Sequence, residues 1–146
     1  MDLRFEKRDT FYVSGYSVET NEASLEEDVA LLRKKYEDKL RMISDRLYFV
    51  AWEGQASEND MIYHFSVETP EVTPDGMTRV EVPATHFAVA TVPAGVSVLE
   101  AWYEFFEKGI PALGATIDTD YDIYFECFDE NGVCELWIPV VKSDGI

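Results

Sequence analysis

Short stretches of alternating hydrophobic and polar residues make up much of this chain, and they indicate a protein built mainly from β-strands. Successive side chains on a strand point to opposite faces, so alternation is typical of a strand with one buried face. The alternating stretches are residues 3–19, 47–52, 61–68 and 121–141. Two other stretches repeat every three or four residues and predict helices that begin at Ser24 and Ser97, each the first residue of a capping box.

The order of these elements recurs within the chain. Arg4-Phe5-Glu6 has a counterpart in Arg79-Val80-Glu81, 75 residues later, and the second capping box follows the first by 73 residues. We therefore expect pseudo-repeats at about residues 1–70 and 77–146. Two β-α-β-β units of this size usually join as one curved antiparallel sheet. The predicted fold is α+β, a single domain over residues 1–146 with two helices on one face of the sheet and a ligand cleft on the other.

The last alternating stretch is predicted to be a hairpin that turns at Asn131-Gly132. This dipeptide favours a two-residue type I′ turn, which needs positive φ at both positions. Such a turn would pair Phe128 with Glu135 and Glu126 with Trp137. These four side chains would then share one face of the sheet, because side chains alternate along a strand. The opposite, helix-covered face would receive Phe125 and Cys127.

The face that carries the two glutamates is expected to be rich in aromatic residues. Its ring-bearing side chains would be Tyr48, Trp52, Tyr63, Phe65, Tyr124, Phe128 and Trp137. A face this apolar is rarely left open to water. We therefore expect it to line a cleft or an interface. An ionised carboxylate is costly to bury unless it is paired, and Glu126 and Glu135 would also repel each other, which should raise one of their pKa values. The pattern predicts a site that a cationic ligand completes.

Composition and charge restrict the partners of this protein. The 146 residues include 12 Lys and Arg against 29 Asp and Glu, and the formal net charge of −17 argues against direct binding to nucleic acid. No stretch approaches membrane-spanning length, and residues 1–4 do not begin a signal peptide. With only two cysteines, Cys127 and Cys134, we expect a reduced, cytoplasmic protein.

Metal and cofactor chemistry have little support in the sequence. His64 and His86 are isolated from each other, and no cluster of Cys, His and Asp has the spacing of metal ligands. The glycines form neither a P-loop nor a dinucleotide-binding fingerprint. We therefore expect no metal and no cofactor.

Four segments together resemble the GyrI-like, or AraC-type effector-binding, domain family. They are Val82–Val89, Glu100-Ala101-Trp102, Phe125–Glu130 and Glu135–Val140, and their order and spacing extend the resemblance over essentially the whole chain. The resemblance implies a duplicated β-α-β-β fold with a ligand cleft between the halves. It also implies that buried glutamates at the positions of Glu126 and Glu135 face cationic aromatic ligands, as in the multidrug-sensing members.

The family includes effector domains fused to helix-turn-helix regulators, gyrase inhibitors, stand-alone binding proteins, and hydrolases of reactive cyclopropane-bearing natural products. This chain has no added residues and no basic surface for a DNA-binding module, so a stand-alone member is expected. It departs from the family pattern at Phe87 and Phe128, where tyrosine is frequent, so neither position can offer a hydroxyl group.

Three functions are compatible with these observations. The first is binding of a small molecule, a lipophilic or cationic aromatic compound, by the two glutamates and the aromatic side chains named above. The second is hydrolysis, in which Glu126 or Glu135 orients water while Tyr124 or Tyr63 supports the leaving group. The third is inhibition of a protein partner, such as a regulator or gyrase, through the acidic surface. Nothing in the spacing distinguishes hydrolysis from binding without turnover. We rank small-molecule binding first, hydrolysis second and protein inhibition third.

Overall fold

The structure is a computed structural model that describes residues 1–53, 60–69 and 73–142 of the chain. Its strands are β1 (Asp2–Arg8), β2 (Phe11–Asn21), β3 (Leu47–Glu53), β4 (Asp60–Glu68), β5 (Thr78–Val82), β6 (Thr85–Thr91), β7 (Ala115–Ile117), β8 (Tyr124–Phe128) and β9 (Cys134–Lys142). Its helices are α1 (Leu25–Arg41) and a second helical segment made of α2 (Val98–Glu104), the π-helical turn η1 (Phe105–Gly109) and α3 (Ile110–Ala112).

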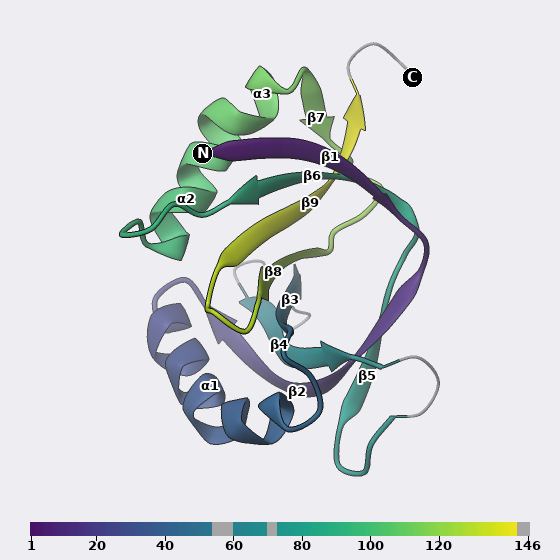
Figure 1. Ribbon diagram of the computed structural model, residues 1–146, viewed down its shortest axis with the longest axis vertical. Helices are drawn as coiled ribbons and strands as arrows, with labels where there is room; N and C mark the ends of the chain where they lie inside the picture. The colour runs from purple at the N-terminus through teal and green to yellow at the C-terminus, as the bar shows by residue number, and fades with distance from the viewer. Residues whose placement is uncertain (54–59, 70–72, 143–146) are drawn as a thin grey trace.

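The strands form one antiparallel sheet in the order β1-β6-β9-β8-β3-β4-β2-β5, with β7 paired to β9. Strands β1 and β2 follow one another past a break at residues 9–10. Strand β1 pairs with β6 over its whole length, and the first part of β2, Phe11–Gly15, pairs with β5. These long strands sweep around one side of the molecule in Figure 1, so the sheet is strongly curved. Both helices lie on the opposite side (Figure 1). The predicted α+β class with one antiparallel sheet is confirmed.

The order strand, strand, helix, strand, strand occurs twice in the described chain, with β7 added in the second round. The assignment of pseudo-repeats stays a prediction. The two predicted capping boxes behave differently. The Ser97 side chain accepts a hydrogen bond from the Glu100 amide at 3.2 Å, whereas the Ser24 side chain makes no capping bond. Instead, the Ser24 amide donates to the Asn21 side-chain oxygen at 3.1 Å. The prediction of a capping box at Ser24 is therefore wrong.

The two faces of the sheet bury two different hydrophobic clusters. We call the face under the helices the helix face. Its buried residues include Leu40 of α1, Trp102 and Phe105 of the second helical segment, and Leu47, Phe49, Phe65 and Leu136 of the sheet. The other face, the inner face, is enclosed by the curvature of the long strands. Its buried residues include Phe11, Tyr48, Val50, Phe87, Phe125, Cys127 and Trp137. No helix in the described ranges is long and apolar enough to span a membrane.

The closing hairpin differs from the prediction by one residue. Phe128 pairs with Cys134, and Cys127 pairs with Glu135. Gly132 has a positive φ of +80°. Among the described residues only glycines have positive φ, so Asn131 does not, and the two residues do not form a type I′ turn. The connection is a longer turn in which the Gly132 amide donates to the Asp129 carbonyl, and the Asp129 carboxylate accepts from the amides of Asn131 and Val133 at 2.8 and 3.0 Å.

This shift of one residue reverses every side chain of β8. Tyr124, Glu126 and Phe128 lie on the helix face, while Phe125 and Cys127 lie on the inner face, so the predicted facing of these five residues is wrong. Tyr63 and Phe65 also lie on the helix face, because they pair directly with Ala51 and Phe49 of β3. The prediction is right for four residues, which lie on the inner face: Tyr48, Trp52, Glu135 and Trp137.

Candidate functional site

An aromatic pocket of about 640 Å³ lies mainly on the helix face, between α2, the start of α1, the end of β3 and the start of β4. Trp52, whose side chain packs on the inner face, also borders it because it lies at the end of β3. This volume falls within the range of small-molecule sites. Its aromatic lining among the described residues consists of Trp52, Tyr63, Trp102, Tyr103, Phe106, Tyr121 and Tyr124. We call this cavity the aromatic pocket.

The second helical segment supplies the outer wall of the aromatic pocket. Trp102 and Phe106 are four residues apart, so they lie on the same side of the helix, and their rings stack at 5.5 Å with an angle of 21°. Trp102 also meets the ring of Tyr124 edge to face at 5.3 Å. The π-helical turn η1 begins at Phe105 and contains Phe106, and such turns are frequent at functional sites.

Glu126 lies behind this wall, with only 7% of its surface exposed. Its Oε2 accepts a hydrogen bond from the Trp102 indole Nε1 at 2.7 Å. Among the described residues no cation lies within salt-bridge distance of it. Burial raises the pKa of Glu126 to about 7, while the Trp102 hydrogen bond and the charge of Arg33 act in the opposite direction. At neutral pH the carboxyl group is therefore about half protonated.

Two tyrosines complete the surroundings of Glu126. Burial raises the pKa of both Tyr63 and Tyr124, and the negative charge of Glu126 raises each of them further. Both phenols are therefore neutral and able to donate hydrogen bonds at physiological pH. The pocket combines aromatic rings with a carboxyl group that makes no salt bridge to any described residue.

A second cavity, the charged pocket, opens on the inner face and has a volume of about 520 Å³. Its described lining is Arg4, Glu6, Arg8, Ser44, Arg46, Tyr48, Glu68, Glu135 and Trp137. Glu135 is well paired there. It lies 2.8 Å from Arg4 and 4.0 Å from Arg46, and it accepts from the Trp137 indole nitrogen at 3.3 Å.

The structure thus divides the predicted site between two pockets on opposite faces of the sheet. Trp52, Tyr63 and Tyr124 line the aromatic pocket, with Glu126 behind them. The predicted residues that line the charged pocket are Tyr48, Glu135 and Trp137. Two others, Phe65 and Phe128, line neither cavity, because both pack against the ring of Phe49.

Sequence reasoning missed two residues of the second helical segment, Tyr103 and Phe106, as lining of the aromatic pocket. The spacing of Trp102 and Phe105 indicates a buried stripe, and Phe105 is indeed fully buried. Tyr103 and Phe106, however, are 56% and 39% exposed at the mouth of the pocket. The available signal was the density of four large aromatic rings within residues 102–106, which is more than one helical stripe can bury.

Other reactive groups offer little chemistry. Burial raises the pKa of the Cys127 thiol to about 12, so it is protonated and a poor nucleophile. Burial lowers the pKa of His64 to about 4, so its ring is neutral at physiological pH. Within the described residues, no three His, Cys, Asp or Glu side chains are grouped where they could hold a metal ion.

Comparison with known proteins adds a family. The family model Cass2, described as integron-associated effector binding protein, matches residues 4–140. The chain belongs to this family. Membership in the GyrI-like effector-binding group, predicted from the sequence motifs, is therefore confirmed, and effector binding of a small molecule is the shared property.

Solved structures of similar fold agree with the family assignment. SAV2435, solved with tetraphenylphosphonium bound, is 12% identical with a TM-score of 0.75, over 97% of this chain and 94% of that one. An integron cassette protein from Vibrio cholerae is 17% identical with a TM-score of 0.68, over 95% of each chain. A transcription regulation protein from Staphylococcus aureus MU50 is 12% identical with a TM-score of 0.70, over 96% and 98%. A search of curated proteins gave no match.

Proposed function

We propose that this Cass2-family protein binds lipophilic aromatic cations in the aromatic pocket, with Glu126 as the counter-ion. The observation that carries the proposal is a buried carboxyl group directly behind a wall of aromatic rings. It has an indole donor but, among the described residues, no cation within salt-bridge distance. The tetraphenylphosphonium bound to SAV2435 belongs to the same chemical class.

The physical chemistry of the pocket favours such a ligand. A cation that reaches Glu126 pairs with a charge that burial has made costly, so the interaction is much stronger than in water. Aromatic faces around the ligand add cation–π attraction of about 0.5–2 kcal/mol for each good contact. Trp102 covers Glu126, so we infer that its side chain moves aside when the ligand enters.

Binding should release a proton below pH 7. The free protein holds a proton on Glu126 with a pKa of about 7, whereas a bound cation favours the ionised form. At pH 6 the protein must give up this proton, and at pH 8 it has already lost it. Affinity for a permanent cation should therefore rise about tenfold from pH 6 to pH 8.

Titration calorimetry with tetraphenylphosphonium tests the proposal on matched variants. Glu126→Gln should weaken binding at least tenfold at pH 8 and abolish its pH dependence. Glu135→Gln removes the same charge from the same hairpin but on the other face, so its affinity should stay within twofold of the wild-type value. Triphenylphosphine oxide, a neutral analogue, should bind weakly and equally to all three proteins. Equal affinity of both glutamine variants for the cation would overturn the proposal.

Hydrolysis is a second candidate, and the grouping of Glu126 with two tyrosine hydroxyls favours it. A carboxyl group with a pKa of about 7 suits general acid–base catalysis at neutral pH, and Tyr63 or Tyr124 can donate a proton to a leaving group. Turnover of a cyclopropane-bearing electrophile that is lost in both Glu126→Gln and Tyr124→Phe would support an enzyme. A stoichiometric complex without turnover would leave binding alone. An interaction with a regulator or gyrase, and a cytoplasmic location, stay predictions.

A further inference from the structure

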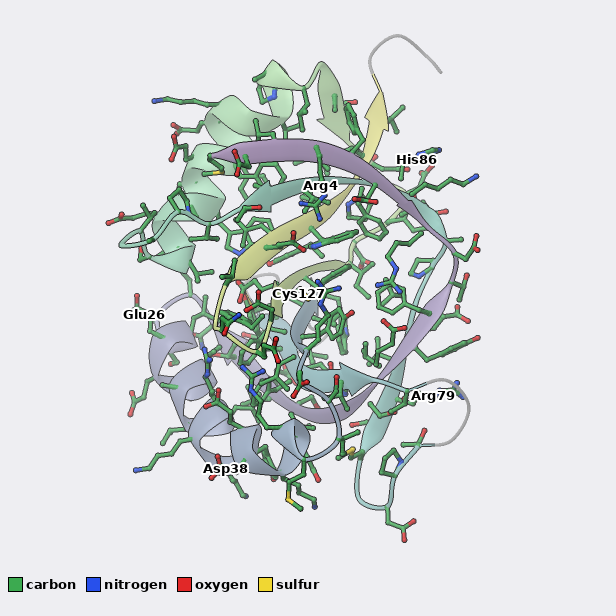
Figure 2. The ribbon with its side chains drawn as sticks, viewed as in Figure 1. Arg4, Glu26, Asp38, Arg79, His86 and Cys127 are labelled. Carbon is green, nitrogen blue, oxygen red and sulfur yellow. The ribbon has the colours of Figure 1, made fainter. Side chains whose placement is uncertain are left out.

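The charged pocket is separated from the aromatic pocket by the sheet itself, and its side chains come from both ends of the chain. Arg4, Glu6 and Arg8 project from the inner face of β1, because they alternate with Leu3 and Phe5, which pack on the helix face. Glu135 belongs to β9, two strands away. In Figure 2 Arg4 points into the space enclosed by the curved sheet.

The guanidinium groups of β1 are held in place by their neighbours. Arg4 donates to Glu6 at 2.9 Å and pairs with Glu135 at 2.8 Å, so it bridges two carboxylates. Arg8 pairs with Glu68 at 3.2 Å, and its guanidinium lies 3.8 Å from the centre of the Phe11 ring. Exposed ion pairs of this kind contribute little to the stability of the fold. A gain in stability therefore does not explain why these charged side chains gather around one cavity.

Both signs of charge stay available to a ligand. Arg46 is half exposed, and its closest carboxylate contact is the 4.0 Å distance to Glu135. Glu6 and Glu68 keep 42% and 44% of their side-chain surface exposed. Cationic and anionic groups therefore face the same cavity, and each has room for a further partner.

The charge balance selects the class of ligand. Three arginines and three glutamates line the pocket, so the lining is formally neutral in a chain of net charge −17. A simple anion gains little from a neutral lining and is repelled by the rest of the protein. A simple cation is opposed by the arginines. A molecule with both charges complements the alternating lining without a net electrostatic cost.

We propose that the charged pocket binds a small zwitterion of the amino acid type. Its carboxylate pairs with Arg46, the arginine of the pocket with the longest carboxylate contact, and its ammonium group pairs with the partly exposed carboxylate of Glu6 or Glu68. Nothing in this site depends on Glu126, so the proposal stands apart from the binding of aromatic cations.

Two indole N–H resonances in nitrogen-15 NMR spectra report the two pockets separately. Trp137 donates to Glu135 in the charged pocket, and Trp102 donates to Glu126 behind the aromatic pocket. The probes are ω-amino acids from glycine to 6-aminohexanoate, each compared with the carboxylate and the amine of the same chain length. At least one zwitterion should shift the Trp137 resonance saturably while Trp102 stays fixed. The matched single ions should bind at least tenfold more weakly.

Variants complete the test. Arg46→Gln should weaken zwitterion binding at least fivefold, whereas Lys108→Gln, which removes an exposed cation from η1, should leave it unchanged. A series without any saturable shift of Trp137 would overturn the proposal, and so would a carboxylate that binds as tightly as its zwitterion. Tetraphenylphosphonium should shift Trp102 but not Trp137, so failure at one pocket is distinguishable from failure at the other.

Discussion

Glu126 and Glu135 lie on neighbouring strands of one hairpin, yet their surroundings are opposite. Glu126 is buried on the helix face with a single indole donor, and its pKa is raised to about 7. Glu135 lies on the inner face between two arginines and a second indole, and 18% of its side chain is exposed. The same residue type is therefore a buried carboxyl group with an indole donor at one site and a fixed member of an ion-pair network at the other.

The difference comes from what the sheet places across from each glutamate. Glu126 pairs with Phe49 on one side and Leu136 on the other, and the second helical segment covers it with aromatic rings. Glu135 pairs with Cys127 and Thr91, but the polar residues of β1 reach over it from the curved end of the sheet. The curvature of the sheet, rather than the local sequence, therefore determines that Glu135 and not Glu126 pairs with arginine.

The largest expected effect is on stability at alkaline pH. The pKa of Glu126 is higher in the folded protein, about 7, than its ordinary value of 4.5, so its contribution to stability is full below pH 4.5 and is lost as the pH rises through 7. Glutamine carries no charge at any pH, so Glu126→Gln avoids the cost of burying an ionised carboxylate. The substitution should raise the free energy of unfolding at pH 8 by about 3 kcal/mol. At pH 4 the variant should be no more stable than the wild type.

Glu135→Gln is the matched control and should change stability in the opposite direction. It weakens the pairs with Arg4 and Arg46, and we expect a loss of about 1 kcal/mol or less at pH 8. Urea denaturation at both pH values measures the two variants side by side. Equal and small effects of the two substitutions would contradict the contrast between the two carboxylates.

An intermediate effect is expected from the two indoles. Trp102→Phe removes the hydrogen-bond donor of a buried carboxylate, whereas Trp137→Phe removes a donor from a carboxylate that keeps its arginine. Both changes remove the same volume. Trp102→Phe should therefore cost about 2 kcal/mol more than Trp137→Phe at pH 8, because it leaves a buried charge without a partner. The difference should shrink at pH 5, where Glu126 is protonated. A difference that does not change with pH would point to packing alone.

The sequence predicted features that depend on neighbouring residues better than features that depend on residues far apart in the chain. Alternation and helical spacing located β1–β4, β8, β9 and both helices, because burial of one face imposes those periods directly. Strands β5 and β6 were indicated only by the internal repeat, and β7 was not predicted. That Glu126 lies among aromatic residues also followed from its neighbours in sequence. The separation of Glu126 from Glu135 did not, because Asn131-Gly132 is compatible with two turns whose registers differ by one residue. The approach of Arg4 and Arg46 to Glu135 depends on sheet curvature, which no local pattern encodes.

The smallest effect tests the turn that separates the two glutamates. Gly132 has a φ of +80°, and a Cβ atom placed there meets nothing within 4 Å, so Gly132→Ala should cost about 1 kcal/mol through backbone strain alone. Asn131 has negative φ and is exposed, so Asn131→Ala should cost no more than a few tenths of a kcal/mol. In a type I′ turn both positions would need positive φ, and the two substitutions would cost similar amounts. Urea denaturation of the two alanine variants therefore distinguishes the registers: unequal costs place Glu126 and Glu135 on opposite faces of the sheet, and equal costs would return them to one face.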